Sequence, residues 1–147
     1  MRLSLPSISD IIIDSGPLYA LFDQSDTYHL ASVTWLQRSR RSRLVANACV
    51  LTEVTCLLSS RGLRTAIDPF LAWASEALEI DNELSGDLPR IRAILAKYAD
   101  LPADFADASL VALAERRNCF SVASVDSDFT IYRGACRRAF RNVLTAG

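Results

Sequence analysis

The segment IIIDSG, residues 11–16, sets three β-branched apolar residues directly before an acid, a small hydroxyl residue and a glycine. An unbroken run of isoleucine is typical of a strand buried on both faces, as the central strands of a parallel sheet are. Asp14 then stands at the carboxyl end of the most buried strand. Open α/β sheets bind their ligands beyond that end, so Asp14 is the first candidate for a functional residue.

The sequence on either side of this segment alternates short apolar strands with helices. We predict further strands at residues 44–46, 78–80, 119–126 and 141–146. The spacing of apolar residues predicts helices at residues 16–21, 26–37, 51–58, 69–78, 87–98 and 104–117. Asp68 is expected to cap the fourth helix and Pro69 to begin it. Strands separated by helices predict an α/β fold with a mainly parallel sheet covered on both faces.

Composition bounds the class of protein. The chain has 147 residues, half of them apolar, which suits one domain over residues 1–147. Sixteen basic and seventeen acidic side chains nearly cancel, so any nucleic-acid binding must come from local clusters. Four cysteines without metal-site or C-x-x-C spacing, and no apolar run of signal-peptide or membrane-spanning length, predict a reduced, cytoplasmic protein without a membrane segment.

Four acids are predicted to meet at one rim of the sheet. Asp14 and Asp126 end strands, Glu53 falls within about the first turn of its helix, and Asp107 lies in the first turn of the last helix. The carboxyl ends of parallel strands share one edge, which brings these side chains together. Asp128 and Asp104 are close enough in sequence to join them, so Asp104 has two interpretations, a member of this group or a simple helix cap.

Each acid alone also has a structural interpretation as a cap, a turn former or a favourable charge at a helix start. Together they require an offsetting positive charge, because two carboxylates about 5 Å apart repel by roughly 3 kcal/mol at an effective dielectric of about 20. Either the group is partly protonated or it binds a cation. The only histidine, His29, lies in another predicted helix. An oxygen-only ligand set favours Mg²⁺ or Mn²⁺ and metal-assisted phosphodiester hydrolysis.

Four segments, in order along the chain, resemble the motifs of one known family. They are IIIDSGPLYALFDQSDTYH, ANACVLTEV, YADLPADFADASLVALAERRN and SVDSDFTIYR. The order and spacing are similar to those of PIN-domain ribonucleases, and the length is similar to that of the VapC-like toxins of bacterial toxin-antitoxin pairs. The resemblance covers nearly the whole chain from Asp10 onward.

The resemblance implies a three-layer α/β/α sandwich and roles for individual residues. The implied metal-binding and catalytic quartet is Asp14, Glu53, Asp107 and Asp126. Asp128 is implied as an accessory ligand, and a shortened fourth motif leaves the roles of Asp126 and Asp128 open to exchange. Ser15 and Ser124 are implied to orient a carboxylate or water, whereas Asp104 matches an acid whose role in the subgroup is less defined. Ser15 stands where threonine is commoner and keeps the hydroxyl.

Basic residues supply the candidate RNA contacts. The connection RSRRSR, residues 38–43, contains four of them: Arg38, Arg40, Arg41 and Arg43. Arginine can bind phosphates bidentately, but a solvated helix end explains the same cluster equally well. Arg133 follows the fourth motif and is the candidate nearest the acids. Arg116 and Arg117 are interpreted first as favourable charges at a helix end.

Other chemically suggestive residues are given structural interpretations. His29 is expected to pack or cap, because a metal-bound water makes a histidine base unnecessary. Trp35 and Trp73 are expected in the core or in a dimer interface. The cysteines are expected to act as small core hydrophobes.

Three functions remain open from the sequence. The first is an Mg²⁺-dependent endoribonuclease toxin that acts on RNA, is inhibited by a cognate antitoxin protein and, from the family, forms a homodimer. The second is a PIN nuclease of RNA processing with no toxic role. The third is a non-catalytic module that binds a metal or a basic peptide. A receiver-like phosphoacceptor domain is disfavoured, because it needs a lysine after a late strand and Lys97 falls within a predicted helix.

Overall fold

The computed structural model describes residues 8–101, 103–134 and 137–144. Its centre is a five-stranded sheet in the order β3-β2-β1-β4-β5, and every neighbouring pair is parallel. The strands are β1 (Asp10–Ile13), β2 (Arg43–Asn47), β3 (Leu78–Asp81), β4 (Ser121–Ala123) and β5 (Arg141–Asn142). The prediction of a parallel α/β sheet is confirmed.

Strand β1 lies at the middle of the sheet, as its isoleucines predict. Ile12 and Ile13 are fully buried, and Ile12 is in register with Val45 of β2 on one side and Val122 of β4 on the other. β-Branched side chains fill both faces of the central strand, where helices cover them. The carboxyl ends of β1, β2 and β4 consequently open on one edge of the sheet.

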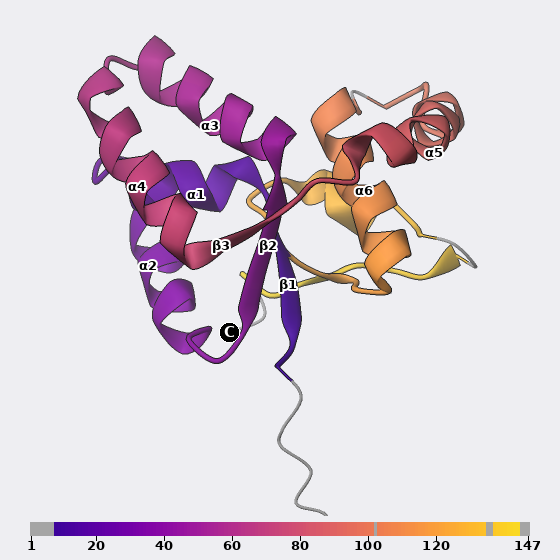
Figure 1. The fold of residues 1–147 in the computed structure, drawn as a ribbon, viewed down its shortest axis with the longest axis horizontal. Helices are drawn as coiled ribbons and strands as arrows, with labels where there is room; N and C mark the ends of the chain where they lie inside the picture. The colour runs from indigo at the N-terminus through magenta and orange to yellow at the C-terminus, as the bar shows by residue number, and fades with distance from the viewer. Residues whose placement is uncertain (1–7, 102, 135–136, 145–147) are drawn as a thin grey trace, which may run out of the picture.

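Helices cover both faces of the sheet, which gives three layers (Figure 1). Helices α1 to α4 lie on one side, and α5 and α6 pack against each other on the other side. Their bounds are α1 (Ser15–Leu21), α2 (His29–Arg38), α3 (Ala48–Ser60), α4 (Ile67–Ala77), α5 (Leu84–Lys97) and α6 (Phe105–Arg117). Two 3₁₀ turns complete the described structure: η1 (Arg64–Ala66) and η2 (Ser127–Thr130).

Several helix starts differ from the predicted ones. Helix α3 begins at Ala48, three residues early, because the Asn47 side chain accepts a hydrogen bond from the Val50 N–H and caps it. Helix α4 begins at Ile67 after η1, so the expected Asp68 cap is wrong and Asp68 lies in the first turn instead. Helix α5 begins at Leu84 and includes Pro89 in its interior, a residue that sequence rules place at helix starts.

The last two strands are shorter than predicted. Strand β4 stops at Ala123, which leaves the segment up to Asp126 as a turn beyond the sheet. Strand β5 contains two residues, and residues 145 and 146 of the prediction lie outside the described residues.

Asp104 caps α6, as one interpretation of the sequence predicted. Within the described ranges, no helix has both the length and the apolar character needed to cross a membrane.

Candidate metal centre

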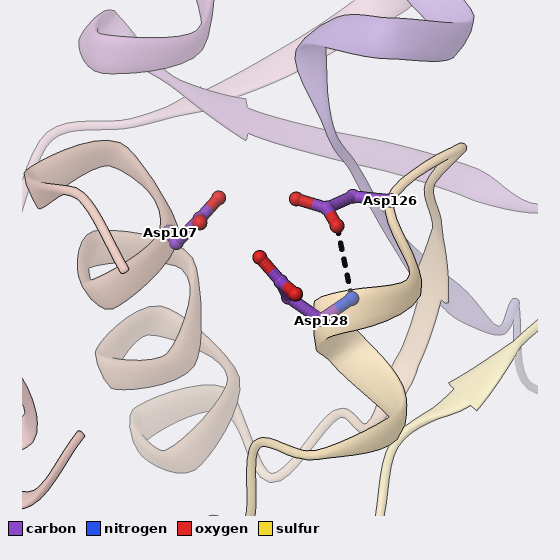
Figure 2. A group of neighbouring side chains, drawn as sticks. All are labelled: Asp107, Asp126 and Asp128. Atoms are coloured by element: carbon purple, nitrogen blue, oxygen red, sulfur yellow. Dashed lines mark hydrogen bonds between the residues drawn. The ribbon is translucent and has the colours of Figure 1, made fainter. Parts of the chain in front are cut away.

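Three aspartates bring their carboxylates together beyond the carboxyl ends of β1 and β4. One oxygen each of Asp107, Asp126 and Asp128 lies within 4.8 Å of the other two (Figure 2). Asp126 caps η2 by accepting a hydrogen bond from the Asp128 N–H at 2.9 Å. This cap turns the chain so that both side chains face Asp107 of α6. Two segments nearly 20 residues apart in sequence thus form one group of oxygen ligands.

Asp107 is held from two directions. Asp104 caps α6, and its carboxylate accepts the Asp107 N–H at 2.8 Å. The Tyr132 hydroxyl donates to one carboxylate oxygen of Asp107 at 3.1 Å. Tyr132 itself is fully buried and packs edge-on against Tyr98 and Phe129. The orientation of the Asp107 carboxylate is therefore fixed by a cap and by an aromatic core.

Asp14 is tied to Asp126 through Ser124. The Ser124 hydroxyl donates to Asp14 at 3.0 Å and accepts the Asp126 N–H at 2.9 Å. The Asp14 N–H bonds to the carbonyl of Ala123, and its other carboxylate oxygen accepts the Ser15 N–H at 2.8 Å. The resemblance implied an orienting role for Ser124, and these contacts are of that kind.

Glu53 reaches the same region from α3. It lies in the second turn, rather than the first, because α3 begins at Ala48. Burial raises the pKa of Glu53, and the charges of Asp14 and Asp104 raise it further, whereas a hydrogen bond with Ser15 opposes the shift. Asp14 and Glu53 are close enough to the other acids to repel them, although the tight group of three does not include them.

Asp14 and Asp107 have raised pKa values and no basic partner among the described residues. Burial, followed by the charges of Asp104 and Asp14, raises the pKa of Asp107 to about 7. Burial also raises the pKa of Asp14, with a smaller contribution from Asp126. Among the described residues, no arginine or lysine forms an ion pair with these acids.

A hard divalent cation fits this group of side chains. Two carboxylate charges 4.8 Å apart repel by about 3 kcal/mol at an effective dielectric of about 20, and a divalent ion would turn that repulsion into attraction. The ligand atoms on offer are carboxylate oxygens, which suit Mg²⁺ or Mn²⁺.

Four of the predicted RNA-binding arginines lie away from the acids. Arg43 begins β2 and pairs with Asp10 at 2.8 Å and with Glu79 at 3.2 Å, so it lies at the amino end of the strand. The remaining members of this cluster lie at or after the end of α2: Arg38, Arg40 and Arg41. The structure does not bring this cluster to the carboxyl edge of the sheet, and its role with RNA stays a prediction.

Arg133 follows η2 in the sequence, as expected, but its guanidinium is bonded to carbonyl groups of the protein backbone. It donates to the carbonyl oxygens of Thr130 at 2.7 Å and of Tyr132 at 2.8 Å. These contacts fix the chain after η2, next to the tyrosine that holds Asp107. An RNA contact by Arg133 also stays a prediction.

Arg116 and Arg117 have a larger structural role than a helix-end charge. Arg116 bridges Asp81 and Asp87 with hydrogen bonds of 2.7–3.0 Å, and Arg117 also binds Asp81 at 3.0 Å. Against the opposing effect of burial, these bonds lower the pKa of Asp81 to about 2. This network joins α6 to β3 and to the start of α5.

The structural interpretations of the other residues are mostly confirmed. The Nδ1 atom of His29 lies 2.7 Å from the carbonyl oxygen of Ala20, which fits a packing role. Trp35 is buried in the core. Cys56 is exposed on α3, so the prediction of a core cysteine is wrong there. Cys49, on the same helix, is half-buried. Cys136 lies outside the described residues.

Two residues that support the site were missed from the sequence. Tyr132 follows Asp126 by six residues, and only its place in an aromatic stretch next to the fourth motif signals its role. Asn142 of β5 donates to the Ser124 carbonyl at 2.8 Å and accepts the Ser124 N–H at 3.3 Å. No local pattern connects Asn142 to a residue 18 positions away, since only the strand pairing brings them together.

Comparison with known proteins gives three matches. The family model described as PIN domain matches residues 11–134. Ribonuclease VapC26 of Mycobacterium tuberculosis (strain ATCC 25618 / H37Rv) is 29% identical over 117 residues, which are 79% of this chain and 86% of that protein. The crystal structure of Mycobacterium tuberculosis VapC20, described as a sarcin-ricin loop cleaving toxin, superposes with a TM-score of 0.75 at 20% identity. That match covers 82% of this chain and 93% of the other, and it bears on the fold alone.

Proposed function

Because the chain belongs to the PIN domain family, we propose that it is a metal-dependent endoribonuclease whose centre is the acid group at the carboxyl edge of the sheet. The family match over residues 11–134 confirms the resemblance that the four motifs indicated. Similarity to ribonuclease VapC26 supports RNA as the substrate. We extend the proposal to a single nuclease domain over residues 1–147.

One observation carries this proposal: the convergence of Asp107, Asp126 and Asp128 within 4.8 Å without an arginine partner among the described residues. We propose these three as ligands of Mg²⁺ or Mn²⁺, with Asp14 and Glu53 completing the site from β1 and α3. When bound, the ion would activate a water and neutralise charge on the phosphoryl group. Ser124 and Tyr132 hold the carboxylates in orientation, and Ser15 supports Glu53.

The test is cleavage of RNA by the purified chain. We expect Mg²⁺ or Mn²⁺ to support cleavage and EDTA to abolish it. Asp107→Asn should abolish cleavage, whereas the matched control Asp68→Asn, also in the first turn of a helix but exposed on α4, should cleave like the parent. Equal rates for Asp107→Asn and the parent would contradict the proposal.

We further propose a toxin role and a cognate antitoxin protein, in keeping with the resemblance to VapC-like proteins. A homodimer is proposed on the same ground. Expression in a bacterial host should arrest growth, and co-expression of the small protein encoded beside it should relieve the arrest. Growth unaffected by a cleavage-competent chain would favour an RNA-processing nuclease without a toxic role.

A further inference from the structure

An apolar groove of about 570 Å³ opens directly beside the acid group. Its walls are the first turns of α3, the start of α5 and the start of α6, which lie side by side in Figure 1. The volume is within the range of small-molecule sites, roughly 300–1,000 Å³. The residues that line it include Ala48, Glu53, Leu84, Asp104 and Phe105.

The groove is continuous with the proposed catalytic centre. Glu53 and Asp104 line it and lie beside the other acids. In addition to burial, the charge of Asp104 raises the pKa of Asp107, and the charge of Asp14 raises the pKa of Glu53. Asp104 is bonded directly to the Asp107 N–H, so the groove begins one helical turn from the ligands of the ion. An RNA strand whose scissile phosphate lies at the acids would therefore place a neighbouring nucleotide at the groove.

The groove offers an aromatic face that the fold does not use. Phe105 is the first residue of α6 and is 44% exposed, although large apolar side chains are usually buried. Leu84 and Ala48 provide further apolar surface around it. Proteins that recognise single-stranded RNA stack unpaired bases on such side chains, with roughly 1–3 kcal/mol per base.

The charges of the groove select the base rather than the phosphate. Within the described part of the chain, none of its lining residues is basic, and Glu53 and Asp104 are both acidic. Phosphate oxygens are repelled by this rim, whereas N–H donors on a base edge are attracted, because carboxylates only accept hydrogen bonds. Guanine offers the most such donors on its Watson–Crick edge. A second copy of the chain placed here on a two-fold axis would bring like charges together.

We propose that this groove binds a nucleobase of the RNA substrate next to the scissile phosphate, with Phe105 stacking on the base and the acidic rim preferring guanine. The inference rests on the proposed nuclease function. In this proposal, residues at the start of α6 contribute to substrate selection. This contribution is independent of any arginine that binds the phosphates of the RNA.

The test uses short single-stranded RNAs made uncleavable by methylene groups in place of the bridging phosphate oxygens, titrated onto the full chain in the presence of Mn²⁺. Phe105→Ala should weaken binding of a guanine-containing oligomer by about 5- to 150-fold, the equivalent of one lost stacking contact. Phe105→Tyr should retain the affinity. Leu71→Ala, which truncates a similarly exposed side chain (43%) on α4, should leave it unchanged.

Each alternative outcome has a distinct signature. Unchanged RNA affinity in Phe105→Ala overturns the proposal. Equal affinity of the parent protein for guanine- and uracil-containing oligomers overturns the guanine preference. A loss of dimer mass in light scattering with RNA affinity intact would assign the groove to a second copy instead. Absence of cleavage with any divalent ion would refute the nuclease function, whereas the uncleavable oligomers still report on the groove.

Discussion

Replacing Asp107 by asparagine should stabilise the metal-free protein while removing activity. The pKa of this carboxyl is raised from 3.8 to about 7 in the folded state. A shift of about three units corresponds to about 4 kcal/mol of unfavourable interaction for the charged form, at about 1.4 kcal/mol per unit. The side chain is only 8% exposed, so solvent screens little of this repulsion. Asparagine is uncharged and can still accept the Tyr132 hydrogen bond.

The sign of the pH dependence follows from the raised pKa. Below pH 3.8 the carboxyl is neutral in both states, and its favourable contribution to stability is fully present. That contribution is lost as the pH rises through about 7, because the folded state must give up a proton that it binds more tightly than the unfolded state. Relative to the parent, Asp107→Asn should therefore gain about 4 kcal/mol at pH 8, and this gain should shrink by about 2 to 3 kcal/mol at pH 5.

Urea unfolding followed by circular dichroism in EDTA, at pH 5 and pH 8, measures this difference. Asp68→Asn serves as the charge-matched control, because it removes an exposed carboxylate on α4, and it should not reproduce the gain of Asp107→Asn at pH 8. Adding Mg²⁺ or Mn²⁺ at pH 8 should stabilise the parent, by about 2.7 kcal/mol at a hundred times Kd, and Asp107→Asn much less. If Asp107→Asn is no more stable than the parent at pH 8, the electrostatic argument for a cation is refuted.

Three further substitutions test the surroundings of the site. Tyr132→Phe removes the hydrogen bond to Asp107, worth about 1.5–3 kcal/mol to a charged group, and should weaken Mn²⁺ binding by at least tenfold in calorimetry. Gly16→Ala places a Cβ in steric conflict with a methyl carbon of Val125 and should lower the free energy of unfolding by about 1–3 kcal/mol, with partial rescue by Val125→Ala. Asp81→Asn should lower the free energy of unfolding by about 2 kcal/mol at pH 7, because the Asp81 pKa is lowered to about 2. Its difference from the parent should shrink as the pH falls from 4 toward 2, since protonation removes the parent's advantage.

The parts of the fold that depend on local pattern were predictable from the sequence. Three isoleucines in a row have few places in a domain other than a central strand, so β1 and the acid that follows it could be located directly. The order of strands and helices then placed Asp14, Asp107 and Asp126 at one edge. The start of α3 was misjudged because capping by Asn47 depends on the geometry after β2, and apolar spacing does not record it.

The supporting contacts of the site could not be predicted in the same way. Tyr132 reaches Asp107 because an aromatic cluster with Tyr98 and Phe129 fixes its ring, and Tyr98 comes from the end of α5, far in sequence from the other two. Asn142 meets Ser124 only through the pairing of β4 with β5. Such contacts depend on tertiary packing, which has no period along the chain. The sequence and its family resemblance therefore indicated which acids meet and pointed to Ser124 and Asp104 beside them, but they did not indicate Tyr132 or Asn142.

A comparison within the same sheet explains why position at a strand end is insufficient to identify a functional acid. Asp81 also ends a strand and is also buried, yet Arg116 and Arg117 bind it and its pKa is lowered to about 2. Asp14 follows β1 in the same sheet and is also buried, but it has neighbouring acids instead, and burial raises its pKa. The chain can thus neutralise a buried acid with arginine and does so on β3. An arginine at the other acids would stabilise the fold in the same way but would occupy the place of the proposed divalent ion. The opposite directions of the two pKa shifts therefore separate a carboxylate that holds the structure together from one that we propose as a metal ligand.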